Sequence, residues 1–550
     1  MLRTMAERLV VAGGLAALLL VMGSASAKSQ VLGGRYDMTV SLGGQSMVGT
    51  VELRQDGSTL EATVEIPAIG LEATGDGSYS DGRYTIEFEY DLGCPAVTVL
   101  SGTVDSTGAL VGAIENTDCN GVGEGDALLV PRTSGESVDT GAGSPEHDFD
   151  RQAWLSDIDV LDRMLRLRHV DLFHSISEPE YSAALEAFRS GIGEWSEART
   201  VVELARFIAG IGDGHTTFFA PSHPALDHRY PFLLWFFEDG LRVLAATEEF
   251  AELAGARLVS IDDTPVEDVY AAISPLIAKD NRMGARYYVI GYFNPVILQE
   301  LGLVDDATSA EVAFVPLAGG PVRRRVVNTH PSAAEDELIW VGARSWISDV
   351  PTLGLTHLLA SPMTIADYQY YWYRVLPEDR AIYFQYNVCF DAEEGPPFVE
   401  VTDEVLQRVD AGGIDRVVID LRHNTGGEPL TARPLIDGLS ERVEQKGLEV
   451  TVIVGRRTFS ASLTNAIELR NEAGASLIGE YPAGKPNNPS EGRPIHLPRT
   501  DVVVRYSSQF LTRDPALGNA EFLPLERLVP LSIDDYVRGV DRPLEIALGR

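Results

Sequence analysis

The stretch Thr458-Phe459-Ser460-Ala461-Ser462 decides the fold class of this chain, because it joins two runs of different hydrophobic period. Leu448 to Val454, before it, has the continuous apolar character of a buried strand. Leu463 to Glu472, after it, has the spacing of an amphipathic helix. A strand that runs into a helix in this way predicts an α/β sheet of parallel strands.

Two further loops follow strand-like runs in the same part of the chain. Asn424-Thr425-Gly426-Gly427 leaves the run Arg416 to Leu421, and Gly484-Lys485-Pro486 leaves the run Ala475 to Gly479. Parallel strands joined by right-handed crossovers place such loops along one edge of the sheet. We therefore expect a hydroxyl, a glycine pair and an amine to meet at this edge, where an acyl-transfer site can form.

The length of 550 residues exceeds what one ordinary core accommodates, so several domains and a multidomain α+β fold are expected. Apolar and polar positions alternate over 28–132, which predicts an accessory antiparallel β-barrel or sandwich. The Ser-, Gly- and Thr-rich residues 133–146 predict a linker. Helical periodicity predicts a helical domain over 147–222, followed by a mixed β module over 223–335 and an α/β core over 336–550.

The N-terminal residues 1–27 have the pattern of an export signal. Arg3 and Arg8 are basic, Leu9 to Val21 is apolar, and Ala25-Ser26-Ala27 fits the small-residue rule for cleavage. The apolar run is short for a membrane span, although an uncleaved anchor is the alternative. We therefore expect a protein exported to the periplasm, the cell surface or the medium, without a stable membrane span after cleavage.

The net charge argues against one class of partner, and the cysteine content limits the disulfides and metal sites that the chain can form. The net charge of −37 argues against nucleic acid, whose phosphates would be repelled. Cys94 and Cys119 lie in one β-rich region, where a local disulfide is plausible, and Cys389 is left over in an apolar context that suggests a buried free thiol. Three cysteines indicate neither a disulfide scaffold nor a zinc site, so no metal and no cofactor are expected. The sequence indicates no oligomeric state.

Ser460 is a candidate nucleophile because its hydroxyl lies at the start of the predicted helix, near the positive end of the helix dipole. Serine also fills the N-cap of many helices, and this structural role is the alternative. An oxyanion needs backbone donors. Gly426 or Gly427 can approach closely because glycine has no Cβ, and Ala461 provides the amide directly after the serine.

Two residues are candidates for the base that activates Ser460. Lys485 is one of only four lysines among the 44 basic residues, and a desolvated lysine can act as a neutral amine. His215 follows the glycine-rich end of the predicted helix Val201 to Ile211 and titrates near neutral pH. A solvated surface lysine and an ordinary loop histidine are the alternatives, and His169, His174 and His423 have no comparable context.

Several motifs together resemble the tail-specific, C-terminal-processing serine peptidases of the S41 family. They are Gly455-Arg456-Arg457-Thr458-Phe459-Ser460-Ala461, Asp420-Leu421-Arg422-His423-Asn424-Thr425-Gly426-Gly427, Ile478-Gly479-Glu480 and Gly484-Lys485. Upstream, Ile211-Gly212-Asp213-Gly214-His215-Thr216 is similar to the Asp-x-His-Thr segment of the tricorn-like and retinoid-binding branches. The resemblance covers about residues 150–550.

The resemblance implies a ClpP/crotonase-like catalytic core, preceded by a helical domain and by a PDZ-like module with its turn at Gly255 to Val266. It also implies functional residues, namely the nucleophile Ser460, the bases His215 and Lys485, and the oxyanion-hole residues Gly426, Gly427 and Ala461. We prefer a Ser460–His215 pair with Lys485 assisting. The chain departs from the processing-protease branch at Leu463, where that branch usually has a glutamate. Asp514 and Glu480 are the residues that we consider for a carboxylate that orients His215.

The expected function is an exported serine endopeptidase that hydrolyses polypeptides through an acyl-enzyme. One alternative is a non-catalytic binding protein on the same core, for a lipid, a retinoid-like ligand or a peptide. A second alternative gives the function to residues 28–132, as a small lipid- or saccharide-binding barrel.

Overall fold

The structure is a computed structural model, and it describes residues 32–42, 45–66, 69–91, 93–104, 108–119, 121–131, 149–331, 338–340, 370–392 and 395–550. The chain forms two compact units, one of 1–43 and 49–137, the other of 44–48 and 138–550. The predicted signal 1–27 and the predicted linker 133–146 lie outside the described residues. None of the helices in the described ranges has the length and apolar content needed to cross a membrane.

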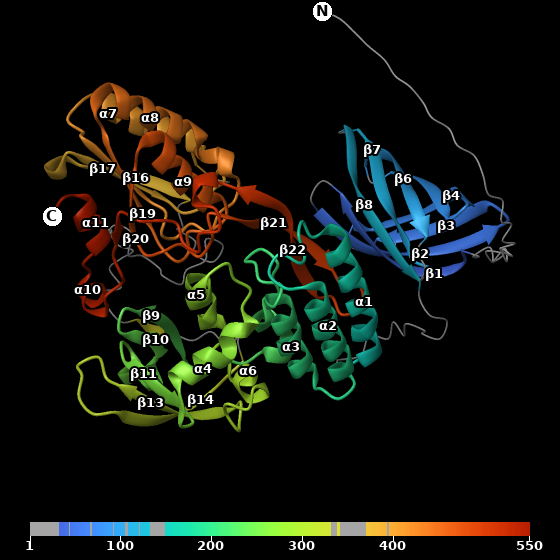
Figure 1. The fold of residues 1–550 in the computed structure, drawn as a ribbon, viewed down its shortest axis with the longest axis horizontal. Helices are drawn as coiled ribbons and strands as arrows, with labels where there is room; N and C mark the ends of the chain where they lie inside the picture. Colours follow the sequence, from blue (N-terminus) through green and yellow to red (C-terminus); the bar gives the residue numbers. More distant parts are fainter. Residues whose placement is uncertain are drawn as a thin grey trace, which may run out of the picture. The chain divides into compact units, whose positions relative to one another are not determined.

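The first unit is a closed eight-stranded antiparallel barrel, which decides between the two architectures expected for 28–132 (Figure 1). The strands follow chain order and β1 closes on β8 through pairs such as Val40 with Ala127. Alternate residues point inward, so that Leu60 and Ile86 are fully buried while their neighbours in sequence are exposed. The strands are β1 Gly34–Leu42, β2 Gln45–Asp56, β3 Thr59–Ile66, β4 Leu71–Ser80, β5 Arg83–Asp91, β6 Pro95–Val104, β7 Leu110–Asp118 and β8 Gly121–Pro131.

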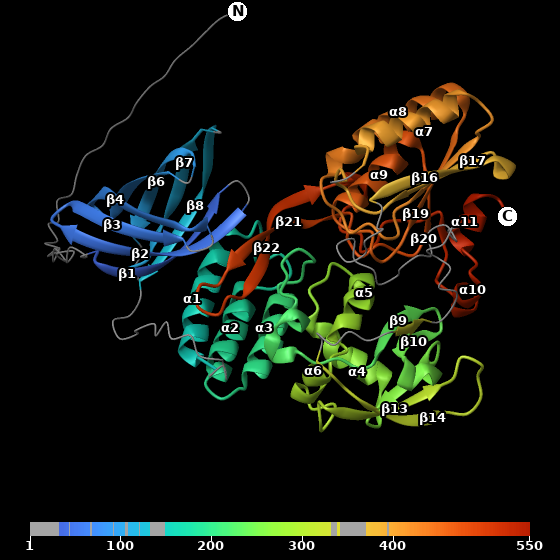
Figure 2. The ribbon, with the colours of Figure 1, turned by 180° about the vertical axis from the view of Figure 1, so that it is seen from behind.

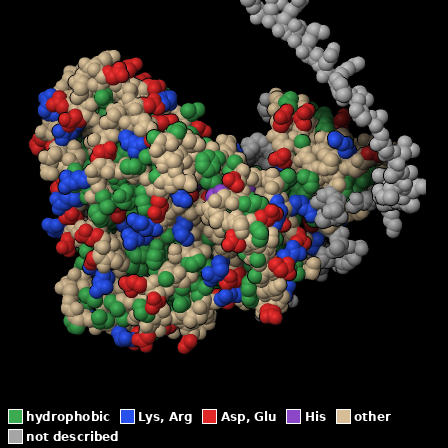
Figure 3. All heavy atoms as spheres, in the orientation of Figure 1, with side chains coloured by type: hydrophobic (Ala, Val, Ile, Leu, Met, Phe, Trp, Pro, Cys, Tyr) green, Lys and Arg blue, Asp and Glu red, His purple; other side chains and the backbone are tan. Residues whose placement is uncertain are grey.

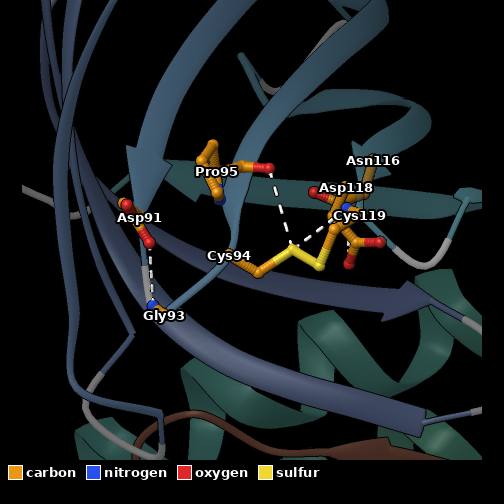
Figure 4. The surroundings of a disulfide bond; sticks show 7 residues. All are labelled: Asp91, Gly93, Cys94, Pro95, Asn116, Asp118 and Cys119. Carbon is orange, nitrogen blue, oxygen red and sulfur yellow. Dashed lines mark hydrogen bonds between the residues drawn. A yellow bond between two sulfur atoms is a disulfide. The ribbon is translucent and has the colours of Figure 1, made fainter.

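A disulfide joins Cys94 to Cys119 in this barrel (Figure 4). The bridge links the residue before β6 to the residue after β7, and the backbone N–H of Cys119 lies 3.0 Å from Cys94 Sγ. The local bridge considered from the sequence is therefore present. Cys389, in the second unit, is buried and free, which confirms the prediction of a buried thiol.

The second unit begins with three helices, α1 (Arg151–Arg168), α2 (Glu178–Ile192) and α3 (Glu197–Ala209). Side chains cap the three N-termini: Asp150 accepts from two amides of α1, Ser177 forms a capping box on α2, and Ser196 caps α3. Helix α3 ends at Ala209, with Gly210 as its C-cap, two residues before the expected end.

A seven-stranded sheet with helices α4 to α6 follows the three-helix segment. Helix α4 begins at Val266, as the sequence predicts, after a tight turn in which Asp262 and Asp263 both have positive φ. The elements are β9 Phe232–Phe237, β10 Gly240–Thr247, β11 Arg257–Ile261, β12 Thr264–Pro265, α4 Val266–Ile273, α5 Arg282–Tyr292, α6 Pro295–Glu300, β13 Ser309–Val315, β14 Arg323–Asn328 and β15 Leu338–Trp340.

The α/β core is a six-stranded sheet in the order β16-β17-β18-β19-β20-β23, parallel from β17 onward. Strands β16 and β17 form an antiparallel hairpin around Pro377 to Arg380. The elements are β16 Tyr371–Leu376, β17 Ala381–Tyr386, α7 Phe398–Asp410, β18 Arg416–Asp420, α8 Arg433–Lys446, β19 Glu449–Val454, α9 Ala461–Ala473, β20 Ser476–Gly479, β23 Arg527–Leu528, α10 Ile533–Arg538 and α11 Arg542–Ala547.

Helices cover both faces of this sheet, which is why its strands read as unbroken apolar runs. Alternate residues pack against α7, α8 and α9 on one face, where Ile419 and Val452 belong to the cluster. Their neighbours Val418 and Ile453 pack on the other face with Leu544 of α11. Figure 1 shows α7 and α8 lying side by side along one side of the sheet.

A separate hairpin, β21 (Asn487–His496) with β22 (Val503–Thr512), corrects one expectation. The apolar run Asp501 to Ser507 predicts a strand that continues the α/β stretch, but β22 pairs antiparallel with β21 in its own two-stranded sheet. Pro489 and Pro494 lie in β21 and lack the N–H that a central strand needs on both sides. In both views the hairpin runs from the core toward helices α1 to α3 (Figures 1 and 2).

Candidate active site

Ser460 occupies the N-cap position of α9 without acting as a cap. Its φ of 53° and ψ of −122° lie in a region that non-glycine residues rarely adopt, and its hydroxyl makes no capping hydrogen bond. Ser462 makes the local contacts instead, because its Oγ lies 2.6 Å from the carbonyl oxygen of Asn424 and 3.0 Å from the amide of Phe459. The Ser460 hydroxyl is thus held away from its own helix by a strained turn.

His215 is the partner of that hydroxyl. Its Nε2 lies 3.1 Å from Ser460 Oγ, although the two residues are 245 positions apart in sequence. The contact exists because the loop after α3 packs on the β21–β22 hairpin, where Thr217 and Arg505 exchange two backbone hydrogen bonds of 3.0 and 2.8 Å.

Asp213 fixes the conformation of the loop that carries His215. Its buried carboxylate accepts from the amides of His215 (2.9 Å) and Thr216 (2.6 Å) and from Ser507 Oγ of β22 (2.7 Å). Burial acts to raise the pKa of Asp213, but the hydrogen bonds from His169 and Ser507 outweigh it and lower the value to about 2. The carboxylate is therefore ionised, and it joins the loop to the hairpin.

His169 is a member of this network that sequence reasoning set aside. Its Nε2 lies 3.1 Å from Asp213 Oδ2 and 2.8 Å from Thr216 Oγ1. The signal that could have found it is weak, since a histidine just after a helix has no motif of its own. The Asp-x-His-Thr segment, by contrast, already contained Asp213 and Thr216.

The surroundings of His215 keep its imidazole in the neutral form, which is the form that can accept a proton. Burial lowers its pKa first, the Arg513 cation lowers it further, and Asp213 opposes them in part, giving a value of about 4. The ring is therefore neutral in the near-neutral pH range. A neutral imidazole at hydrogen-bond distance from a hydroxyl is the arrangement of a general base.

The glycine loop lies directly against Ser460. A Cβ on Gly426 would come within 2.8 Å of Ser460 Cβ and 3.1 Å of the Ala461 nitrogen. The Gly426 amide donates to Asn424 Oδ1 at 2.9 Å, whereas the amides of Gly427 and Ala461 donate to no acceptor within the described ranges. Among the described residues, the amides of Gly427 and Ala461 are thus open to an incoming acceptor.

Lys485 takes part through its backbone. Its N–H lies 3.3 Å from Asp280 Oδ2, and its ammonium makes no hydrogen bond with Ser460 or His215 in the part of the chain that the structure describes. Asp280 also accepts from the Gly214 amide (2.6 Å) and from Asn488 Nδ2 (2.6 Å), and burial raises its pKa to about 6. This carboxyl thus links the Lys485 loop to the His215 loop.

Neither carboxylate considered for orienting His215 reaches it. Asp514 pairs with Arg470 at 2.6 Å, and Glu480 pairs with Arg456 at 2.6 Å. His215 Nδ1 is buried and has no hydrogen-bond partner among the described residues. Leu463, where the processing-protease branch has a glutamate, is fully buried in the core cluster of the sheet.

The surroundings of the site hold no metal-type cluster. Within the described ranges, no group of three or more His, Cys, Asp or Glu side chains could hold a metal ion. On the face in Figure 3, acidic and basic side chains are interspersed, so that the net charge of −37 does not form one uniformly acidic surface there.

These elements define a multidomain α+β protein, in which a serine and a histidine pair where the loops after the core strands meet the segment after α3. The solved structures of mature CPAF have this fold: the complex with lactacystin has a TM-score of 0.51 at 12% identity, covering 71% of this chain and 96% of that chain. A second structure of mature CPAF has a TM-score of 0.50 at 13% identity, covering 72% and 96%.

The photosystem II D1 C-terminal processing protease is also similar, with a TM-score of 0.33 at 14% identity over 71% of this chain and 97% of that chain. No known family profile and no curated protein sequence matches the chain. At these identities the similarity shows the fold alone, and the fold of this protein is that of mature CPAF.

Proposed function

We propose that this protein is an exported serine endopeptidase of the S41 type, with Ser460 as nucleophile and His215 as general base. The observation that carries the proposal is the 3.1 Å contact between Ser460 Oγ and His215 Nε2, made by a serine whose turn is strained and whose hydroxyl caps nothing. Strain of this kind persists where the surrounding structure holds it, and it clusters at functional sites.

In the proposed reaction, Ser460 Oγ attacks the carbonyl carbon of a peptide bond while His215 Nε2 takes the hydroxyl proton. The amides of Gly427 and Ala461 donate to the oxyanion. The protonated His215 then gives its proton to the leaving amine, which leaves an ester on Ser460. A water molecule, deprotonated by His215, attacks this ester, and the proton returns to Ser460 Oγ as the acid product leaves.

Within this proposal, Gly426 shapes the oxyanion loop because its own amide is already engaged by Asn424. Lys485 supports the site through its backbone contact to Asp280, and His215 is the base that the hydrogen-bond geometry favours. We also propose that 336–550 form a ClpP/crotonase-like core and that 223–335 form a PDZ-like module. Export is supported by the Cys94–Cys119 disulfide, since such bridges persist in oxidising compartments.

Labelling with a fluorophosphonate probe tests the proposal without knowledge of the peptide substrate. Wild type should be labelled, Ser460→Ala should not, and His215→Ala should be labelled roughly 100-fold or more slowly, as expected for loss of a general base. Ser440→Ala, on the exposed side of α8, is the matched control. Equal labelling of wild type and Ser460→Ala would refute the nucleophile and favour the non-catalytic binding alternative. A Lys485→Ala variant slower than His215→Ala would reverse the order of the bases.

A further inference from the structure

The imidazole of His215 lacks the hydrogen-bonded carboxylate that usually orients a catalytic histidine. Its Nδ1 is buried without a hydrogen-bond partner among the described residues. The nearest carboxylate in sequence, Asp213, directs its oxygens at the His215 and Thr216 amides and at Ser507. Within the described ranges, we therefore look for another group that sets the plane of this ring.

The ring of Phe459 lies flat against the His215 imidazole. The two ring centroids are 4.5 Å apart, and the planes meet at 21°. Phe459 immediately precedes Ser460, so the residue that stacks on the base is bonded to the nucleophile. A shift of the ring and a shift of the serine are coupled through one peptide unit.

The Phe459 backbone is itself firmly held. Its amide donates to the Asn424 carbonyl oxygen at 3.3 Å and lies 3.0 Å from Ser462 Oγ. Its carbonyl oxygen accepts from the Ser462 amide at 3.2 Å. The ring of Phe459 is therefore attached to a backbone whose N–H and C=O groups are both hydrogen-bonded.

Two glycines make room for the Phe459 ring. A Cβ on Gly214 would come within 3.0 Å of Phe459 Cζ, and a Cβ on Gly484 would come within 3.3 Å of Phe459 Cδ2. Both distances are tighter than ordinary van der Waals contact, so a side chain at either position would push the ring. Gly214 directly precedes His215, and Gly484 directly precedes Lys485, so both flanking loops are built around this ring.

We propose that Phe459 is the positioning residue for His215, holding the imidazole by stacking where other serine hydrolases use a carboxylate. The inference rests on the proposed function, because it assigns a residue to the same Ser460–His215 pair. A flat aromatic face also favours the imidazolium that forms when His215 takes the serine proton, since the face of the ring attracts a cation. The other charged groups that act on His215 are Arg513, Asp213 and Arg505.

The test compares Phe459→Leu in two backgrounds by the rate of fluorophosphonate labelling. With His215 present, we expect labelling to fall about 10- to 100-fold, a part of what a general base contributes. On the His215→Ala background, the same substitution should change the rate by no more than about twofold, because its effect passes through the missing imidazole. Phe88→Leu, an equally large change in the core of the barrel, which is the other unit, is the control and should keep the wild-type rate.

A second measurement detects the stacking of Phe459 on His215 directly by NMR. In wild type, the imidazole C–H resonances of His215, assigned by their loss in His215→Gln, should be shifted upfield by the Phe459 ring current. Phe459→Met should remove that shift. An unshifted His215, or a Phe459→Leu effect of equal size in both backgrounds, would overturn the inference. Absence of labelling in wild type would refute the proposed function instead, and the ring-current measurement would still test the stack.

Discussion

At the residue scale, Arg513 acts on His215 without touching it through a hydrogen bond. Its guanidinium donates to Thr464 Oγ1 (2.8 Å), Asn488 Oδ1 (2.6 Å) and Ser490 Oγ (2.9 Å), which are all neutral acceptors. The guanidinium is thus held in place by neutral groups. Within the described ranges, no carboxylate accepts a hydrogen bond from it. After burial, it is the largest cause of the low pKa of His215.

The low pKa of His215 predicts how the rate of fluorophosphonate labelling depends on pH in the acid range. His215 must be neutral to accept a proton, so the labelling rate should rise as pH increases through about 4 and then stay level. Arg513→Gln removes a cation, which raises the pKa of His215 and moves the limb to higher pH. Arg505→Gln should shift it in the same direction but less, because Arg505 is a smaller cause. A limb that does not move in Arg513→Gln would contradict this account of the field at His215.

Gly426 predicts a second residue-scale outcome. Its φ of 116° is unfavourable for a side chain, and an added Cβ would meet Ser460 Cβ at 2.8 Å. Gly426→Ala should therefore displace the oxyanion loop and slow labelling by about 100-fold or more, the scale of a lost oxyanion donor. Gly447→Ala is the matched control, since Gly447 also has positive φ but an added Cβ meets nothing within 4 Å. Unchanged labelling in Gly426→Ala would exclude close apposition of this loop and Ser460.

Ser460, His215 and the glycine loop could be named as candidates from the sequence because each lies in a short local motif. It could not choose between Gly426 and Gly427 as the amide donor, because that depends on which N–H the Asn424 side chain occupies. It left the two bases open as well. His215 comes to Ser460 through tertiary packing, and no local pattern contains that contact.

At the scale of elements, the loop after α3 and the β21–β22 hairpin form one cooperative contact. Asp213 is its centre, because its carboxylate joins two loop amides to Ser507 of β22. Asp213→Ala leaves buried donors unpaired and should lower the free energy of unfolding by roughly 3 kcal/mol, while Ser507→Ala should cost about 1 kcal/mol. Chemical denaturation measures both.

Fluorophosphonate labelling of the same variants distinguishes an effect on the position of His215 from an effect on the stability of the whole protein. Asp213→Ala should lose most of its labelling under conditions where it remains folded, because the His215 loop is no longer held to the hairpin. Asp150→Ala removes the N-cap of α1 and should cost about 1 kcal/mol without a change in labelling. Wild-type labelling in a folded Asp213→Ala protein would show that the carboxylate is not needed to place His215.

The parallel strands β18, β19 and β20 were predicted within one residue of their observed starts, because burial on both faces makes them continuously apolar. The β21–β22 hairpin was not. Its strand β21 contains Asn487, Pro489, Glu491 and Gly492, and such a composition has neither the period nor the propensity of a strand. Its pairing depends on β22 and on the helical segment against which it lies.

At the scale of the whole molecule, the barrel and the second unit have separate cores, and the Cys94–Cys119 disulfide belongs to the barrel alone. Replacing both cysteines by alanine should destabilise the barrel by about 3 kcal/mol, the usual effect of opening a loop of this size. Labelling of Ser460 should be unchanged, because the site lies wholly in the second unit. Scanning calorimetry measures the unfolding transition of the barrel. If labelling of Ser460 is lost together with that transition, the two units depend on each other.

The separation of 245 positions between His215 and Ser460 also has a consequence for the order in which the site forms. During synthesis the base is made first, and the nucleophile and the hairpin that receives the base are made long afterwards. Until β22 has been synthesised and has paired with β21, a chain that already contains His215 and Ser460 does not bring the two residues together. Under the proposed function, the Ser460–His215 pair therefore forms only after β22 has been made and has paired with β21.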